Sequence, residues 1–242
     1  MGGRTVRVRL NVDTGLDRDG VDLDEAVAEA ERVAALPGLE LVGLFTHEGQ
    51  AHRGASFDEV KQLGRQSAAG LLRVAEAVRR AGLPCEEIAP GATPTAADLA
   101  AYPGVTEVRP GTYIFYDAMC METMDLTPAD CAVRVITTVV DLPTRDRVII
   151  DGGSKTFFND QMPQWGRAYC LEYPALRLEK CSEEHGHCQW TGDGTPPVKL
   201  GDRLTWIPTH VCPVVNLFDQ LVGVRGEQVE TTFAIAARGK VK

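Results

Sequence analysis

The first half of the chain alternates strand-like and helix-like segments at short intervals, and this alternation constrains the fold more than any other feature. Apolar and β-branched residues alternate or form short runs at 5–12, 39–46, 85–89 and 105–108, which predicts strands. Apolar residues recur at helical spacing at 22–36, 56–81 and 96–102, which predicts helices, the second opened by a capping box at Ser56 and Glu59. Because the connections are short, we expect four β/α units with parallel strands and right-handed crossovers.

The second half changes character. Strand-like segments lie at 133–141, 147–150, 169–173, 203–207, 220–225 and 231–236, with no convincing long helix between them. The predicted fold class is therefore α/β plus β, with β/α units over residues 1–118 and a mainly-β domain over 119–242. A chain of 242 residues is long enough for one large domain or two modest ones.

Composition excludes several classes of protein. The chain has 25 Lys and Arg against 34 Asp and Glu, a net charge of −9, which disfavours nucleic acids and anionic membranes as partners. No apolar run approaches the roughly 18 residues needed to span a bilayer, and the start lacks the apolar region of a signal peptide. Seven cysteines form no Cys-x-x-Cys pair, which indicates reduced thiols and a cytoplasmic protein.

Polar residues gather where each predicted parallel strand ends, at 13–18, 46–49, 89–95 and 109–113. In parallel α/β folds this face holds the active site. Two of these segments, Gly91-Ala92-Thr93 and Gly111-Thr112, can offer backbone N–H groups and a hydroxyl to an anion, which predicts a phosphate cradle. The alternative is that they are ordinary strand-to-helix turns, in which Gly and Thr are common.

A second cluster combines His210 and Cys212 with a polar segment about 25 residues earlier. If the strand at 204–208 continued through this motif, both side chains would face one side and could bind a borderline-soft ion such as zinc. Glu184, His185 or His187 could add a ligand or a base. A lone His-x-Cys pair is, however, more often structural than metal-bound.

Seven motifs, in order over nearly the whole chain, resemble the D-serine dehydratase and D-threonine aldolase group. They are DTGLDR at 13–18, THEG at 46–49, PGATPT at 90–95, EVRPGTYIFYD at 107–117, DGGSK at 151–155, EHG at 184–186 and HVCPVVNL at 210–217. The resemblance implies the alanine-racemase fold, a pyridoxal-phosphate (β/α)8 barrel followed by a β domain. It also implies a D-amino acid as the small-molecule substrate and a homodimer.

The resemblance also implies roles for individual residues. It places the cofactor phosphate on Gly91, Ala92, Thr93, Gly111 and Thr112. Arg18 and Arg109 would approach the cofactor ring, and His47, Tyr113 and His185 would be catalytic or line the pocket. His210 and Cys212 resemble a zinc pair, with manganese or another divalent cation as the alternative. D-threonine aldolases tend to carry Asp at the second ligand position, so Cys212 favours the dehydratase.

One departure from the family pattern concerns the cofactor-anchoring lysine, which in the family lies on the first barrel strand. The resemblance begins here at what looks like the fifth strand, and no lysine takes that position. The six lysines are Lys61, Lys155, Lys180, Lys199, Lys240 and Lys242. We therefore expect the C-terminal part of such an enzyme, in which residues 1–118 form a partial (β/α)8 barrel, its last four β/α units, with open sheet edges and an exposed apolar barrel interior.

The implied reaction is elimination of water from D-serine or a similar 3-hydroxy-D-amino acid, with zinc polarising the hydroxyl. Two alternatives stay open. One is a metal-activated D-threonine aldolase, and the other is a non-catalytic fragment or half-barrel that assembles with a partner.

Overall fold

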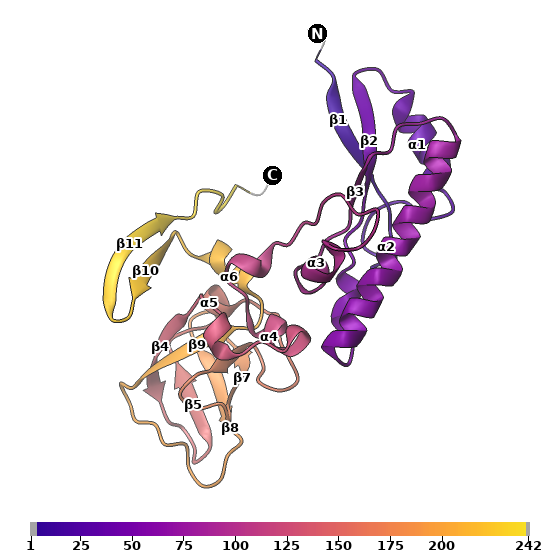
Figure 1. Ribbon diagram of the computed structural model, residues 1–242. Coiled ribbons are helices and arrows are strands. Elements are labelled where there is room, and N and C mark those ends of the chain that lie inside the picture. Colours follow the sequence, from indigo (N-terminus) through magenta and orange to yellow (C-terminus); the bar gives the residue numbers. More distant parts are fainter. Residues whose placement is uncertain (1–3, 241–242) are drawn as a thin grey trace. The chain divides into compact units, whose positions relative to one another are not determined.

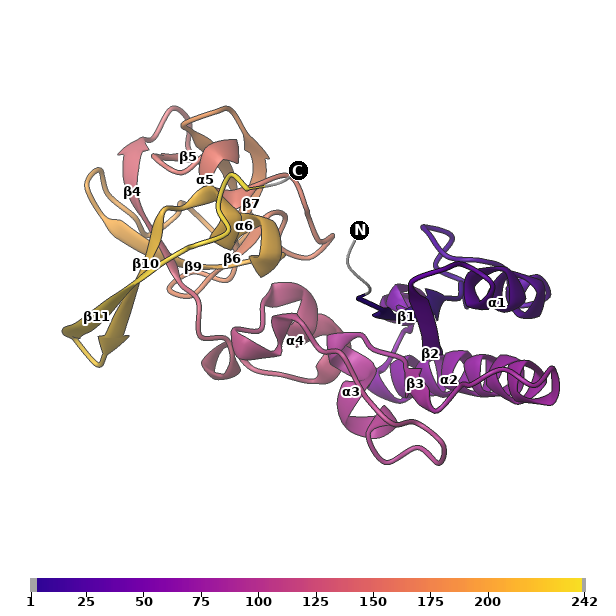
Figure 2. The ribbon, with the colours of Figure 1, turned by 90° about the horizontal axis from the view of Figure 1, so that it is seen from above.

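The computed structural model describes residues 4–240, which form two compact units (Figures 1 and 2). Unit 1 contains residues up to 113 together with 123–125, and unit 2 contains 114–122 together with the residues from 126 onward. None of the helices within residues 4–240 is long and apolar enough to cross a membrane. Each unit has its own hydrophobic core.

Unit 1 is built on a parallel sheet with strand order β1-β2-β3. The strands are β1 (Val6–Asn11), β2 (Leu39–Phe45) and β3 (Glu87–Ala89). The helices are α1 (Ala26–Ala34), α2 (Phe57–Arg80) and α3 (Thr93–Leu99), with short 3-10 turns at Gly49–Arg53 and Thr112–Ile114. Helices α1 and α2 lie on one face of the sheet (Figures 1 and 2), where Leu10, Leu41, Leu44 and Ile88 pack against them. The predicted alternation is confirmed for these elements.

One helix of unit 1 begins where the sequence predicts, and another begins earlier. Helix α2 begins as predicted, because the Ser56 hydroxyl accepts a hydrogen bond from the Glu59 N–H group. Helix α3 begins at Thr93, three residues before the predicted start, because Pro94 suits the first turn of a helix, where its missing N–H group is not needed.

The strand predicted at 105–108 is wrong. The N–H groups of Thr106 and Glu107 both donate to the Ile88 carbonyl, while the Thr106 hydroxyl accepts from the Ile88 N–H group. Residues 105–108 therefore lie beside β3, but they are bonded to it through the Thr106 side chain and the shared Ile88 carbonyl. A regular ladder of backbone hydrogen bonds does not form between them. The described part of unit 1 has three parallel strands, where four were predicted.

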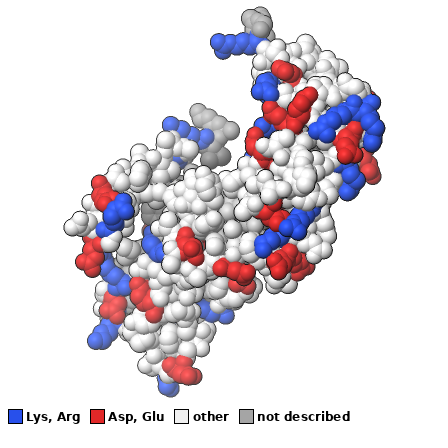
Figure 3. Space-filling model, viewed as in Figure 1, with Lys and Arg blue, Asp and Glu red and all other residues white. Residues whose placement is uncertain are grey.

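The expectation of an apolar barrel interior is also wrong. Odd-numbered residues of β1 point away from the helices, and Arg7 and Arg9 both pair there with Glu87 on β3, at 2.6 and 2.7 Å. Arg9 also pairs with Glu107 at 2.6 Å. These ion pairs make the uncovered face polar. Figure 3 likewise shows acidic and basic side chains next to one another on the face in view.

Unit 2 is an antiparallel barrel with strand order β6-β9-β4-β5-β8-β7. Its strands are β4 (Val135–Asp141), β5 (Arg147–Ile150), β6 (Ala168–Cys170), β7 (Leu176–Cys181), β8 (Gly186–Trp190) and β9 (Arg203–Pro208). β6 and β7 stand at the two ends of this order. The N–H group of Arg167, just before β6, donates to the carbonyl of Leu178 on β7 at 2.9 Å and so connects the two ends. The sequence missed β7 and β8. In β7 three charged residues obscure the alternation, and β8 is a short segment of five residues that contains a glycine, a histidine and a glutamine.

Short helices and a hairpin complete unit 2. The helices are α4 (Ala118–Met124), α5 (Ser154–Phe157) and α6 (Val211–Leu217), with a 3-10 turn at Pro128–Asp130. Strands β10 (Gln220–Arg225) and β11 (Gln228–Ala234) form a separate antiparallel hairpin. Every residue of β11 is exposed to solvent.

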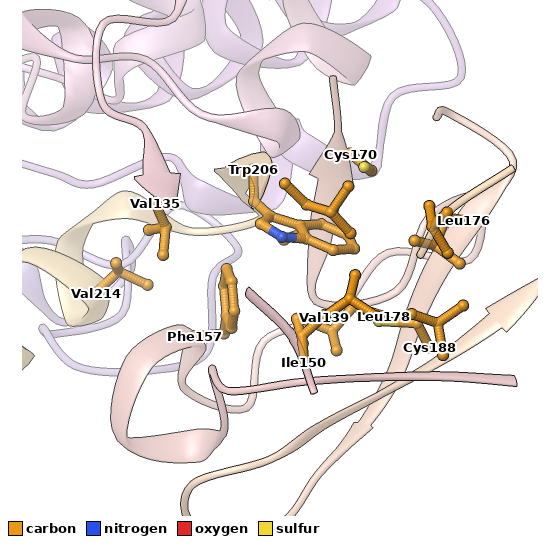
Figure 4. Packing of buried hydrophobic residues seen from close by; sticks show 14 residues of the cluster. Val135, Val139, Ile150, Phe157, Cys170, Leu176, Leu178, Cys188, Trp206 and Val214 are labelled. Atoms are coloured by element: carbon orange, nitrogen blue, oxygen red, sulfur yellow. The ribbon is translucent and has the colours of Figure 1, made fainter. Parts of the chain in front are cut away.

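The core of unit 2 centres on Trp206, which is fully buried (Figure 4). Its ring packs edge-on against Phe157 with 6.0 Å between ring centroids, and its indole N–H donates to the Thr137 hydroxyl at 2.8 Å. Cys170 and Cys188 belong to the same core, and burial raises the pKa of both thiols. All seven cysteines are free thiols, as predicted.

Candidate active site

The segment that follows β3 comes very close to the segment around Arg109. A Cβ atom placed on Gly91 would lie 2.4 Å from the backbone nitrogen of Arg109, so only glycine fits there. Ala92, which is buried, then precedes the first residue of α3. The close approach brings residues 91–93 beside residues 109–112, which the sequence analysis also assigned to the cradle.

Three donors converge on the Thr93 hydroxyl oxygen. They are the Gly111 N–H group at 3.2 Å, the Thr112 N–H group at 3.0 Å and the Thr112 hydroxyl at 2.8 Å. A Cβ atom on Gly111 would meet no atom within 4 Å, so the space beside these donors is open. N–H and hydroxyl donors gathered in this way suit an anionic oxygen that takes the place of the Thr93 hydroxyl as their acceptor.

His47 and Glu48 hold the Gly91 peptide group from both sides. His47 Nδ1 lies 2.8 Å from the Gly91 carbonyl oxygen, and Glu48 Oε2 accepts the Gly91 N–H bond at 2.9 Å. Because a carbonyl only accepts, Nδ1 of His47 carries the proton. In the neutral ring, Nε2 is then the acceptor. Glu48 is fully buried.

Arg109 ties together the ends of two strands. Its guanidinium donates to the carbonyl oxygens of Thr46, after β2, and Ala89, at the end of β3. It also lies 4.7 Å from the centroid of the Phe45 ring. Burial lowers the pKa of Arg109, although an arginine remains charged. Its donors are thus directed at the protein backbone.

Arg18 and Tyr113 are not bonded into this cluster. The Arg18 side chain is exposed and pairs with its neighbour Asp19 at 2.8 Å. The preceding turn is organised by Asp13, whose carboxylate accepts three backbone N–H bonds. Burial alone would raise the pKa of Asp13, but these bonds lower it overall. Tyr113 is 53% exposed.

The second predicted pair, His210 and Cys212, lies in unit 2 at the start of α6. The expected continuation of the strand is wrong, because β9 ends at Pro208 and His210 directly precedes the helix. The two side chains nevertheless meet. A hydrogen bond with Cys212, opposed by burial and helped by Asp160, raises the pKa of His210 to about 9.

Two carboxylates that the sequence analysis missed hold this motif in place. Asp160 Oδ2 lies 2.7 Å from His210 Nδ1. Asp117, which is buried, accepts the Val211 N–H bond at 3.0 Å and the Cys120 N–H bond at 2.9 Å. It therefore caps the first turn of α6 from a distant part of the sequence.

The remaining residues of this cluster do not gather around His210. His185 is exposed in the turn between β7 and β8, where its carbonyl accepts the Ser182 N–H bond. Glu184 pairs with Lys155, and His187 Nε2 lies 3.0 Å from the Ser182 hydroxyl. Within residues 4–240, no group of three or more His, Cys, Asp or Glu could hold a metal ion.

Two family models match consecutive parts of the chain. The model described as Alanine racemase, N-terminal domain matches residues 2–118, and the one described as Putative serine dehydratase domain matches residues 132–224. The chain belongs to the D-serine dehydratase and D-threonine aldolase group. This membership confirms the resemblance and the fold class, and explains the parallel-sheet unit followed by a β barrel.

Two relatives in this group match nearly the whole chain. A D-threonine aldolase of Arthrobacter sp is 32% identical over 98% of this chain and 62% of its own length. A D-threo-3-hydroxyaspartate dehydratase of Delftia sp. is 29% identical over 99% of this chain and 65% of its own length. The chain thus spans less than two thirds of the length of either relative.

Solved structures agree with this assignment. A D-threonine aldolase from Filomicrobium marinum superposes with a TM-score of 0.83 at 28% identity, over 98% of this chain and 65% of that one. The Delftia dehydratase superposes with a TM-score of 0.82 at 28% identity, over 96% of this chain and 66% of that one. Two variants of a D-threo-3-hydroxyaspartate dehydratase also match. In one a histidine and in the other a cysteine two positions later is changed to alanine, and the cysteine variant is in the metal-free form.

Proposed function

We propose that this chain is part of a pyridoxal-phosphate-dependent lyase that removes water from 3-hydroxy-D-amino acids. Residues 1–118 would be its partial barrel and 119–242 its metal-binding β domain. The observation that carries the proposal is the convergence of the Gly111 and Thr112 N–H groups and the Thr112 hydroxyl on Thr93. Thr93, Gly111 and Thr112 would hold the cofactor phosphate. The cofactor ring supplies an electron sink at the substrate Cα.

Residues around the cradle would bind and orient the substrate. His47, with its proton fixed on Nδ1 by the Gly91 carbonyl, can accept a proton at Nε2. Tyr113 follows Thr112 directly and is 53% exposed, and we assign it to the lining of the site. Arg109 would act mainly by fixing the strand ends, because its donors are bonded to the Thr46 and Ala89 carbonyls.

His210 and Cys212 would hold a divalent cation, and their nitrogen and sulfur donors favour zinc. Such an ion would polarise the substrate 3-hydroxyl as a Lewis acid. The bond between His210 Nδ1 and Asp160 supports this role, because a metal-binding imidazole usually donates its other N–H group to a carboxylate. Two protein ligands would leave positions open for substrate or water.

Dehydratase and aldolase remain the two candidate activities, since relatives of both kinds match the chain. The His-x-Cys spacing favours the dehydratase. A D-threo-3-hydroxyaspartate dehydratase carries a histidine and a cysteine at the same spacing, and its cysteine variant is in the metal-free form. We include in the same proposal a cytoplasmic homodimer, as the family resemblance implies.

The activities can be separated with the full-length gene product. D-serine should give pyruvate and ammonia, and D-threo-3-hydroxyaspartate the corresponding oxo acid, whereas an aldolase would release glycine from D-threonine. Glycine formation without any oxo acid would contradict the dehydratase. Metal analysis should find zinc in the unaltered protein and little in His210→Ala or Cys212→Ala. Unchanged zinc in either variant would refute the metal assignment.

A non-catalytic role for this chain by itself is tested through its lysines. Lys61 pairs with Asp58 and Lys155 with Glu184, so both ammonium groups are engaged at the surface. Borohydride reduction of the chain with pyridoxal phosphate, followed by peptide mapping, should find no lysine labelled stoichiometrically. Stoichiometric labelling at one lysine would show instead that this chain carries its own cofactor anchor.

A further inference from the structure

Glu48 is a buried carboxylate that lies in the THEG motif but that the sequence analysis gives no role. Its exposed fraction is 0%, although it lies at the start of a loop directly after His47. Burying a carboxylate costs several kcal/mol unless hydrogen bonds compensate for the lost water. The partners of this carboxylate therefore show what the residue does.

Both oxygens of Glu48 are bonded to the segment between β3 and α3. Oε2 accepts the Gly91 N–H bond at 2.9 Å, and Oε1 accepts the hydroxyl of the fully buried Thr95 at 2.5 Å. These partners stand at the two ends of residues 91–95, with Ala92 and Thr93 between them. A single side chain thus fixes both ends of the segment that carries the Thr93 hydroxyl.

The position of this segment determines where the cradle donors meet. Gly91 packs directly against the Arg109 backbone, and Thr93 receives the N–H bonds of Gly111 and Thr112. A shift of residues 91–95 would therefore separate the Thr93 hydroxyl from those N–H groups. The Gly91 N–H group is itself bonded to Glu48, so it is not directed at a ligand.

We infer that Glu48 is a positioning residue for the phosphate cradle. Its carboxylate holds residues 91–95 in the geometry that brings the Thr93 hydroxyl to the Gly111 and Thr112 donors, which the proposed function assigns to the phosphate. Gly91 then contributes by its lack of a side chain. The inference rests on the proposed function for the identity of the ligand, and the geometry of the loop can be tested without any ligand.

Three variants separate the parts of this inference. Glu48→Ala removes both bonds. Glu48→Gln keeps the shape and can bond both partners, because Thr95 can donate to the Ala92 carbonyl, 3.1 Å away, while accepting from the new amide. Thr95→Val removes the hydroxyl bonds to Glu48 and to the Ala92 carbonyl, keeps the side-chain shape and leaves the Gly91 bond of Glu48 in place. The control is Glu59→Ala, which removes a carboxylate bonded to the Ala55 N–H group in the same unit.

The first measurement compares binding of pyridoxal phosphate with binding of pyridoxal, by equilibrium dialysis of this chain. Glu48→Ala should raise the Kd for pyridoxal phosphate about tenfold or more, the factor expected when buried donors lose a charged acceptor. The Kd for pyridoxal should stay unchanged. Thr95→Val should give a smaller effect, and Glu48→Gln and Glu59→Ala should bind like the unaltered chain.

The second measurement is amide hydrogen exchange without ligand. Glu48→Ala should speed exchange in peptides covering 89–113, whereas Glu59→Ala should speed it only near 55–60. Unchanged exchange in 89–113, or equal losses of pyridoxal and pyridoxal phosphate binding, would overturn the positioning role. If the unaltered chain bound both compounds equally, the proposed phosphate site would fail, while the exchange result would still decide what Glu48 does to the loop.

Discussion

At the scale of single residues, carboxylates that accept N–H bonds set the local geometry of both candidate sites. Glu48 holds the peptide group of Gly91, Asp117 caps the first turn of α6, and Asp160 faces the His210 ring. Asp13 organises the turn after β1 in the same way. Each carboxylate restricts backbone or ring positions that the neighbouring site depends on, so its effects can be measured separately from the chemistry.

Asp160→Asn should weaken zinc binding by about 10- to 100-fold, the usual effect of losing a carboxylate behind a metal-binding imidazole. The measurement is zinc competition with a chromophoric chelator. Asp146→Asn is the control, because Asp146 bonds Gln189 and Thr144 in the same unit. Equal zinc affinity in Asp160→Asn and the unaltered protein would rule out this role.

The lowered pKa of Asp13 should make the stability of the chain depend on pH. Because its folded-state pKa is lowered, its contribution is complete above the unfolded pKa of about 4 and disappears as the pH falls through the folded value. The free energy of unfolding of Asp13→Asn should therefore fall below that of the unaltered chain at pH 7, with a smaller difference at pH 3. Urea titrations at both values test this, and a difference that grew at pH 3 would contradict it.

At the scale of elements, close backbone contacts and buried side chains determine which segments can change. Gly91→Ala places a methyl group 2.4 Å from the Arg109 nitrogen, so it should destabilise unit 1 by about 1–3 kcal/mol. Gly111→Ala is the matched control, because its methyl group would meet no atom within 4 Å and should change stability by less than about 0.5 kcal/mol. Denaturant unfolding compares them, and equal losses would contradict the packing described.

The barrel and the hairpin of unit 2 should respond differently to truncation. Trp206→Ala empties the centre of the barrel core and should cost about 3–5 kcal/mol. Val229→Ala, on β11, should cost less than about 0.5 kcal/mol because the side chain is 67% exposed. Both variants are unfolded with urea. Tryptophan fluorescence follows the unfolding of Val229→Ala, and circular dichroism follows that of Trp206→Ala, which lacks one of the fluorescent side chains. A large loss at Val229 would show that the hairpin is covered in solution.

At the scale of the whole molecule, the seven thiols divide sharply by accessibility. Cys212 is exposed and Cys181 half-buried, while the other five are buried. A thiol reagent should therefore label Cys212 quickly, Cys181 more slowly and the rest only after unfolding. Mass mapping of the labelled peptides identifies the sites, and Cys212→Ser should remove the fast phase. Rapid labelling of a core cysteine such as Cys188 would contradict the barrel packing.

Much of this molecule follows from local sequence patterns, and the exceptions have physical causes. Apolar periodicity predicts β1, β2, α1 and α2, and the Gly and Thr residues after the strands identify the cradle. The false strand at 105–108 arose because a side-chain hydroxyl replaces a ladder bond there. Glu48, Asp117 and Asp160 could not be found from sequence, because their partners lie 43, 94 and 50 residues away.

The proposed function places Tyr113 at the lining of the site, which makes this residue a practical starting point for changing the selectivity. The residue is 53% exposed, so replacing it should leave the fold intact. The adjacent Thr112 stays fixed by its bonds to Thr93. A saturation library at this single position would therefore sample different pocket walls against one constant anchoring point. Residues 47, 48 and 91 should be kept unchanged in any such library, because they determine where that anchoring point lies.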